Sequence, residues 1–279
     1  MNAKLYLDED MITPQVLPVA AGQACVFTRR RPGRETANED AAGIFTGPDG
    51  CAVLAVADGL GGLPAGGHAA ALTLQQLAAQ VTRMPCGDVQ REAVLTGLEN
   101  ANTAVLETGQ GGATTIAVAG IDRHTVRAYH AGDSMILVTG QRGRIKYQSV
   151  PHSPVGYAEA SGMLDTEGAM FHTERHLVSN MVGMTEMRIE MSPPIELAPR
   201  DTLILASDGV FDNLYVSEIV DLVRTGPLAA AGARLLAQCA QRMEQAGGGN
   251  PNKPDDLTFV LYRRQPGHTG RPDPGQPPQ

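Results

Sequence analysis

Residues 51–59 read CAVLAVADG, seven apolar residues followed directly by an aspartate and a glycine. A continuous apolar run of this length predicts a strand buried on both faces, and Asp-Gly is a common turn at a strand end. The arrangement recurs in LILASDG (203–209) and, with serine after the aspartate, in RAYHAGDS (127–134). The chain thus repeats an apolar strand with an aspartate at its end.

Further apolar runs and periodic segments extend this pattern along the chain. Six runs predict strands at 51–57, 114–119, 125–129, 135–139, 202–206 and 257–262. Helical spacing of apolar residues appears at 67–81, 89–107, 217–224 and 227–245. Hairpin-like strand pairs mixed with separate long helices indicate the α+β class, with antiparallel sheet covered by helices.

Two segments stand apart from this pattern. Residues 141–183 are polar, carry His152, His172 and His176, and show no clean period, so we expect a long, flap-like surface excursion. Residues 265–279 (QPGHTGRPDPGQPPQ) contain too much proline and glycine to pack and are predicted to be a disordered tail. Residues 1–264 are predicted to form a single domain.

The composition excludes several classes of protein. The 279 residues carry a net charge of −8 and only 4% aromatic residues without tryptophan, which disfavours nucleic-acid binding. The N-terminus has no apolar signal region, and no run approaches a membrane span. The four cysteines show no CxxC pattern, which favours reduced thiols and a cytoplasmic location; they are Cys25, Cys51, Cys86 and Cys239.

Two more acidic pairs flank predicted strands: Glu39-Asp40 precedes the apolar run 43–45, and Asp255-Asp256 opens the last strand. A single Asp-Gly is usually a turn, but repetition allows these carboxylates to meet at one edge of the core. Gathered carboxylates repel, and Mg²⁺ or Mn²⁺ relieves the repulsion because these cations prefer oxygen ligands. A glycine after the aspartate lets a cation approach the backbone carbonyl. We therefore expect one or two metal ions and phosphoryl transfer or hydrolysis.

Six strings occur in the order and rough spacing of a known family: NEDA (38–41), VADGLGG (56–62), GGATT (111–115), HAGDS (130–134), ASDGVFD (206–212) and DDLTFVLY (255–262). With them, residues 25–263 resemble the metal-dependent, type 2C serine/threonine protein phosphatases, in their bacterial branch. The resemblance implies a central sandwich of two antiparallel β-sheets flanked by α-helices on both faces, a four-layer αββα fold.

The resemblance also implies roles for individual residues. Asp58 matches the carboxylate that bridges two metal ions, and the Gly59 carbonyl matches a ligand of one of them. Asp208 and Asp255 match the remaining direct ligands. Asp58 and Asp208 are thus the expected catalytic aspartates, and the expected cofactor is two Mn²⁺ or Mg²⁺ ions.

Four more acids extend the implied site. Asp40, with Glu39 beside it, matches the acidic pair that holds metal-bound water. Asp133 matches the ligand of a third, weaker metal site. Asp212 is a further supporting acid nearby.

The family's phosphate-binding arginine precedes the acidic pair. Arg34 is the closest match, although it lies one residue further from Asp40 than expected, and Arg31 remains an alternative. Leu60 stands where eukaryotic members have a histidine that protonates the leaving oxygen. The general acid is therefore unassigned, and a metal-bound water is the simplest substitute.

The implied reaction is hydrolysis of phosphoserine or phosphothreonine by a hydroxide that bridges two Mn or Mg ions, without a covalent enzyme intermediate. An arginine suits the phosphate because it grips two oxygens at once. The implied partners are phosphorylated proteins and a cognate bacterial Ser/Thr kinase. We expect a monomer, without nucleic acid or membrane insertion.

Three alternatives remain open. Residues 25–31 satisfy C-x5-R, the loop of cysteine-dependent tyrosine phosphatases, but the bulky interior and Pro32-Gly33 make a buried Cys25 the better interpretation. His172 and His176 are four apart and raise a zinc hypothesis, against solvated loop histidines. The third alternative is a catalytically weak pseudophosphatase that binds phosphoproteins, which the retained aspartates disfavour.

Overall fold

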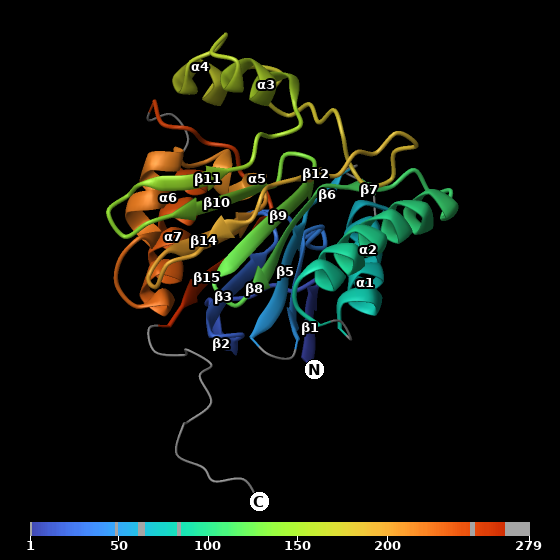
Figure 1. The fold of residues 1–279 in the computed structure, drawn as a ribbon. Helices are drawn as coiled ribbons and strands as arrows, with labels where there is room; N and C mark the ends of the chain where they lie inside the picture. The colour runs from blue at the N-terminus through green and yellow to red at the C-terminus, as the bar shows by residue number, and fades with distance from the viewer. Residues whose placement is uncertain (1, 48–49, 61–64, 83–84, 246–248, 266–279) are drawn as a thin grey trace, which may run out of the picture.

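The computed structural model describes residues 2–47, 50–60, 65–82, 85–245 and 249–265. Two antiparallel sheets stack face to face at its centre (Figure 1). The first sheet has the order β1-β4-β5-β8-β9-β12, and β13 also pairs with β9. Its strands are β1 (Asn2–Leu7), β4 (Ala41–Thr46), β5 (Cys51–Ala57), β8 (Ile116–Asp122), β9 (Thr125–Ala131), β12 (Glu190–Met191) and β13 (Ile195–Glu196).

The second sheet has the order β11-β10-β14-β15-β3-β2. Its strands are β2 (Gln15–Val19), β3 (Gly22–Arg29), β10 (Met135–Thr139), β11 (Ile145–Gln148), β14 (Thr202–Ala206) and β15 (Leu257–Arg264). A small third sheet pairs β6 (Gly59–Leu60) with β7 (Ala113–Thr114). The predicted strands at 51–57, 135–139 and 202–206 therefore have the observed bounds.

Helices cover both outer faces of the sandwich. On the first sheet, α1 (Ala65–Val81) and α2 (Asp88–Glu107) bury Leu74 and Leu98. On the second, α6 (Val216–Val223) and α7 (Leu228–Glu244) bury Leu235 against Phe259. The expected four-layer αββα arrangement is confirmed.

The central layer explains why its strands are apolar throughout. All seven residues of β5 are buried, because one face of the strand meets the helices and the other meets the second sheet. Leu54 and Val56 contribute to the core between the sheets, which also contains Val260 and Tyr262 from β15. Burial on both faces removes the alternation of a half-exposed strand.

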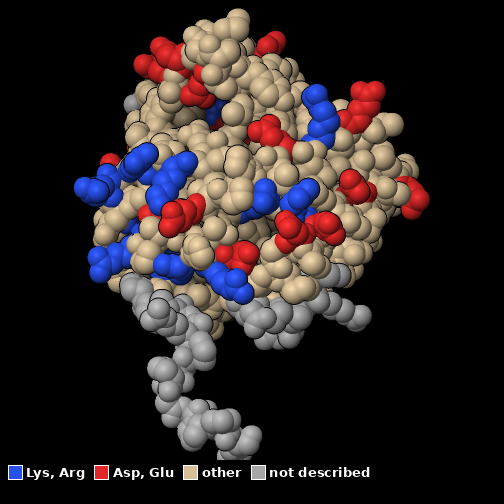
Figure 2. Space-filling model, in the orientation of Figure 1, with Lys and Arg blue, Asp and Glu red and all other residues tan. Residues whose placement is uncertain are grey.

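Residues 141–183 are more regular than expected. Besides β11, they contain two short helices that the sequence analysis did not predict, α3 (Pro154–Ala160) and α4 (Thr166–Met170). Ser153 and Asp165 cap the two helices by accepting hydrogen bonds from backbone N–H groups. One or two turns are too few to display a helical period. We call residues 149–183 the flap, and Figure 2 shows acidic side chains gathered over its two helices.

The cysteines also differ from expectation. Cys51 at the start of β5 forms a disulfide with Cys86, which precedes α2, with 5.6 Å between their Cα atoms. The prediction of four reduced thiols is thus wrong for this pair. Cys25 and Cys239 are free and buried. Cys51 and Cys86 are 35 positions apart, and no local sequence pattern predicts a disulfide between them.

The C-terminal segment is described only at its beginning. Gln265 donates its backbone N–H to the carbonyl of Ala21, and the rest of the predicted tail lies outside the described residues. Within the described ranges, no helix has the length and apolar character needed to cross a membrane.

Candidate metal centre

Strand register brings the aspartate-bearing ends to one edge of the sandwich. In the first sheet Ala41 pairs with Ala57, so Asp40 and Asp58 leave their strands side by side. In the second sheet Ala206 pairs with Phe259, so the segment after β14 meets the segment before β15. Both sheets therefore contribute carboxylates to the same edge, as expected.

The pKa of Asp58 shows that the carboxylates lie close together. Burial raises its pKa well above the ordinary value of 3.8, and four neighbouring carboxylates raise the pKa further, namely Asp40, Asp208, Asp133 and Asp255. Repulsion of this kind requires charges at close range. The structure therefore brings together all five aspartates that the sequence analysis assigned to a metal site.

The other carboxylates at this edge are also difficult to ionise. Burial, followed by repulsion from Asp256, raises the pKa of Asp40 to about 8, although the Ser207 hydroxyl donates to Asp40 Oδ2 at 2.7 Å and opposes the rise. Burial and then Asp212 raise the pKa of Asp133 to about 6. Burial and Asp212 also raise the pKa of Asp208 well above its ordinary value.

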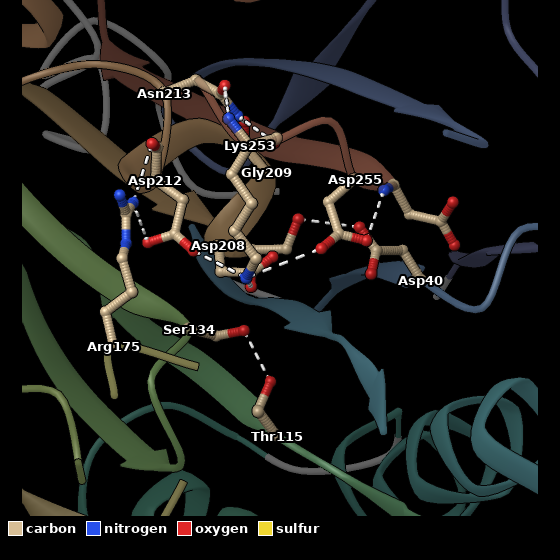
Figure 3. A network of polar contacts seen from close by, with 12 residues as sticks. Asp40, Thr115, Ser134, Arg175, Asp208, Gly209, Asp212, Asn213, Lys253 and Asp255 are labelled. Atoms are coloured by element: carbon tan, nitrogen blue, oxygen red, sulfur yellow. Dashed lines mark hydrogen bonds and ion pairs between the residues drawn. The ribbon is translucent and has the colours of Figure 1, made fainter. Parts of the chain in front are cut away.

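A lysine that the sequence analysis missed lies among these acids (Figure 3). Lys253 Nζ is 2.5 Å from Asp208 Oδ2, 2.7 Å from Asp212 Oδ2 and 3.6 Å from Asp255 Oδ2. Burial alone would lower the pKa of Lys253, but Asp208 and Asp212 more than offset it and raise the pKa above its ordinary value. Lys253 is therefore a cation at this edge.

A second missed cation reaches the site from the flap. Arg175 Nη2 lies 2.6 Å from Asp212 Oδ1 and also donates to the Asp212 carbonyl at 2.7 Å. The same guanidinium donates to the carbonyl of Met170 in α4. Beneath the flap lies a cavity of about 110 Å³ that Asp133 and Asp208 line together with Arg175. The cavity thus opens onto the carboxylates.

Asp256 holds the loop that carries the candidate arginines. Its Oδ1 accepts the Arg31 N–H at 2.6 Å, and its Oδ2 accepts the Glu39 N–H at 2.7 Å. Arg34 is exposed and lines a cavity of about 430 Å³ together with Glu39 and Asp40. Within the described part of the chain, no hydrogen bond or ion pair engages the Arg34 side chain. Arg34 therefore has a free guanidinium and lines the same cavity as two of the acids.

Glycine is required after two of the aspartates for a reason that the sequence did not reveal. A Cβ atom on Gly59 would lie 2.5 Å from the Gly66 carbonyl carbon and 2.7 Å from the Glu39 oxygen. A Cβ atom on Gly209, in α5 (Asp208–Phe211), would lie 1.9 Å from the Asp256 oxygen. Close backbone packing at this edge therefore excludes a side chain, in addition to the expected access to the Gly59 carbonyl.

Two buried threonines position the backbone of Asp58. The Asp58 N–H donates to Thr115 Oγ1 at 3.3 Å, and Thr114 Oγ1 donates to the Asp58 carbonyl at 2.8 Å. Thr115 Oγ1 also shares a hydrogen bond of 2.6 Å with Ser134 Oγ, next to Asp133 (Figure 3). Both threonines are fully buried.

The flap histidines divide into two kinds. His152 is buried rather than solvated: it stacks on His130 and accepts the Gly132 N–H at Nδ1. His172 and His176 remain at least partly exposed. Neither belongs to any cluster of three potential metal ligands among the described residues, which favours solvated histidines over zinc.

Cys25 is not a nucleophile. It is fully buried in β3, and burial raises the pKa of its thiol to about 12. A catalytic cysteine instead needs access and a lowered pKa. The expected packing role of Cys25 is confirmed, and the C-x5-R alternative is removed.

The chemistry of the donor set fits a hard divalent cation. Among the described residues, the groups that converge on this edge are mainly carboxylates, backbone carbonyls and hydroxyls, and Mg²⁺ and Mn²⁺ favour such ligands. Eight acids gather at this edge, and Lys253 and Arg175 form ion pairs with some of them. The acids are Glu39, Asp40, Asp58, Asp133, Asp208, Asp212, Asp255 and Asp256. The fold and this edge define a class of αββα protein suited to metal-assisted chemistry.

Comparison with known proteins identifies the family. The family model described as protein phosphatase 2C matches residues 29–248, and the chain belongs to this family. Protein phosphatase PhpP of Streptococcus pneumoniae is 30% identical over 211 residues, which are 70% of this chain and 82% of PhpP. The chain is thus similar in sequence to a bacterial phosphatase over most of its length.

Solved structures agree with the sequence comparison. Serine/threonine phosphatase Stp1 from Staphylococcus aureus has a TM-score of 0.75 and 25% identity, over 86% of this chain and 94% of that one. The catalytic domain of serine/threonine protein phosphatase PstP, solved with two manganese ions, has a TM-score of 0.65 and 24% identity, over 86% and 96%. The predicted family and fold are confirmed, and the chain is a bacterial protein phosphatase 2C-type enzyme.

Proposed function

We propose that this enzyme removes phosphate from phosphoserine and phosphothreonine in proteins, in reactions that require two Mn²⁺ or Mg²⁺ ions. The observation that carries the proposal is the meeting of five aspartates from both sheets at one edge. The names of its relatives support the substrate class, since PhpP is a protein phosphatase and Stp1 a serine/threonine phosphatase. The two manganese ions of PstP support the cofactor.

The proposed ligands are Asp58, the Gly59 carbonyl, Asp208 and Asp255, with Asp40 and Glu39 supporting water beside them. When bound, the metal ions would supply a hydroxide-like water near neutral pH and neutralise charge on the phosphate. The apo carboxylates support this assignment, because their raised pKa values show how poorly the protein itself balances their charge. Metal ions would remove that imbalance.

The protein's own residues would bind and orient the substrate. Arg34 has a free guanidinium and lines the same cavity as Asp40. It is the proposed phosphate clamp, because an arginine can hold two phosphate oxygens in fixed geometry. Arg31 is the weaker candidate because it is not among the described residues that line this cavity. The flap cavity that reaches Asp133 and Asp208 is the proposed path for the phosphorylated side chain. Because the Leu60 side chain has no proton to donate, a metal-bound water remains the proposed general acid.

We further propose that the enzyme is a monomer that reverses a bacterial Ser/Thr kinase in the cytoplasm, where ATP-dependent phosphorylation takes place. The Cys51–Cys86 disulfide is the observation that opposes this location, since such bonds are uncommon in reducing compartments. A thiol measurement on protein isolated from cells tests this part of the proposal.

The function is tested by phosphate release from a phosphothreonine peptide. We expect hydrolysis with Mn²⁺, none after EDTA treatment, and none in Asp208→Ala with Mn²⁺ present. Asp221→Ala is the matched control, because Asp221 is an exposed surface aspartate on α6 and should leave the rate unchanged. Full activity of Asp208→Ala would refute the assignment. Metal binding by the wild-type protein without hydrolysis would favour the pseudophosphatase.

A further inference from the structure

Lys253 is built into the carboxylate edge by its backbone. It belongs to the segment between α7 and β15, and its N–H donates to Asn213 Oδ1 at 2.8 Å. Asn213 Nδ2 donates in return to the Lys253 carbonyl at 2.8 Å and to the Gly209 carbonyl at 2.9 Å. Asn213 is fully buried. The lysine is therefore anchored to the same helical turn that carries Asp208 and Asp212.

Two cationic side chains, Arg175 and Lys253, contact the two carboxylate oxygens of Asp212. Arg175 binds Oδ1 at 2.6 Å, and Lys253 binds Oδ2 at 2.7 Å (Figure 3). The side chains of Asp212 and Arg175 are only 17% and 16% exposed, so solvent screens this arrangement weakly. Asp212 thus has a cationic partner on each oxygen before any metal ion binds.

This arrangement bears on the third, weaker metal site expected at Asp133. Asp133, Asp208 and Asp212 line the same cavity beneath the flap, so Asp212 lies on that side of the site. Lys253 contacts both Asp208 and Asp212 there. A divalent cation at this position would have to displace the ammonium or share its ligands.

We infer that the Lys253 ammonium takes the place of the third divalent cation, so that this enzyme binds two metal ions where its sequence motifs would suggest three. The inference rests on the proposed metal-dependent function. A tethered cation neutralises Asp212 at any metal concentration, whereas a weakly bound ion does so only when the metal is abundant. Asp58, Asp255, the Gly59 carbonyl and Asp208 Oδ1, the oxygen that Lys253 does not contact, remain for the two metal ions, with Asp40 and Glu39 beside them.

The test is Mn²⁺ titration of the metal-free protein by calorimetry, with native mass spectrometry to count bound ions. We expect two ions on the wild-type protein. Lys253→Met should bind a third ion, with an affinity at least about tenfold above any residual third binding to the wild-type protein. Lys253→Arg keeps the charge and should again bind two.

Lys146→Met is the matched control. Lys146 also lies 2.5 Å from an aspartate, Asp201, and its side chain has the same 29% exposure. It lies near the Thr139–Thr202 end of β10 and β14, opposite the end that leads to Asp208. This variant should bind Mn²⁺ like the wild-type protein. Circular dichroism establishes that each variant is folded. In the metal-free state Lys253→Met should unfold at a lower temperature than Lys146→Met, because it loses the counter-charge of three aspartates.

The outcomes separate this inference from the proposed function. Three ions on the wild-type protein, or an unchanged number and affinity in Lys253→Met, would overturn the role of Lys253 while leaving the metal-dependent function intact. A wild-type protein that binds no Mn²⁺ would contradict both. Neither measurement depends on phosphatase activity.

Discussion

The guanidinium of Arg175 lies 2.6 Å from the carboxylate of Asp212, and this ion pair joins the flap to the segment that follows Asp208. Both side chains are mostly buried, and Arg175 also holds the Met170 carbonyl at the end of α4. One side chain thereby fixes both α4 and the wall of the cavity that opens onto Asp133 and Asp208. The position of the flap is coupled to the carboxylate edge through this pair.

Replacing Arg175 should loosen the flap. Arg175→Gln removes a charge-assisted contact worth about 1.5–3 kcal/mol and leaves Asp212 without one of its two cations. We expect faster amide hydrogen exchange across residues 154–178. We also expect that the KM for a phosphopeptide rises relative to the wild-type enzyme, and that it rises more than the KM for a small aryl phosphate. Arg224→Gln is the control, since it breaks the more exposed pair with Asp221. Unchanged exchange in the flap would show that Arg175 does not hold it.

The metal-free protein should lose stability as the pH rises. The pKa values of Asp40 and Asp133 are about 8 and about 6 in the folded protein, against an ordinary 3.8. The folded state therefore keeps protons that the unfolded state releases. The stability that these groups contribute is complete below about pH 4 and is lost as the pH rises through about 6 and then about 8.

Thermal unfolding in EDTA should accordingly show a lower Tm at about pH 8 than at about pH 5, and Mn²⁺ should restore the Tm at the higher pH. Burial lowers the pKa of His130, which gives an opposite slope, so Asp40→Asn serves to isolate the carboxylate effect. That variant should show a smaller decrease. A Tm that rises steadily with pH in EDTA would be inconsistent with crowded, protonated carboxylates.

The phosphate clamp can be assigned by comparing two arginines. Arg34→Ala should reduce kcat/KM for a phosphopeptide by about 10- to 100-fold, as expected for a lost charge-assisted phosphate contact. Arg31→Ala should have a small effect, because Asp256 binds only the backbone N–H of Arg31. The reverse order of effects would assign the clamp to Arg31.

The disulfide can be tested by counting thiols. Denatured, non-reduced protein should expose two free thiols, from Cys25 and Cys239, and two more after reduction. Cys86→Ser should lower the free energy of unfolding by about 2–4 kcal/mol under oxidising conditions, because the bond restricts the unfolded chain. Four free thiols in the non-reduced protein would show that the bond does not form, and would support the cytoplasmic location.

Much of the site could be predicted because its signals are local. Asp58 and Asp208 each follow a strand whose apolar residues are consecutive in the sequence. Strand pairing then brings such ends together without further information. The hairpin of β2 and β3 was missed because its turn contains Ala20, which adopts a φ of 50° without the glycine or asparagine that usually announces such a turn.

The cations could not be predicted in the same way. Lys253 lies 45 residues from Asp208, and Arg175 lies 37 residues from Asp212. The position of Lys253 depends on the path of the 249–254 loop, and the position of Arg175 depends on the fold of the flap. Neither conformation can be predicted from a periodic sequence pattern. Cationic residues that neutralise the carboxylates from distant segments of the chain can be identified only when the fold is known.

The most direct test of the metal centre is Mn²⁺ binding to the metal-free protein measured by calorimetry in wild type and Asp58→Asn. Asp58 is surrounded by the four other site aspartates, and the variant keeps its shape while removing its charge. We predict saturable binding of two ions to the wild-type protein and a loss of at least about 100-fold in affinity, roughly 2.8 kcal/mol, in Asp58→Asn. Equal binding by the two proteins would contradict a metal centre at this edge.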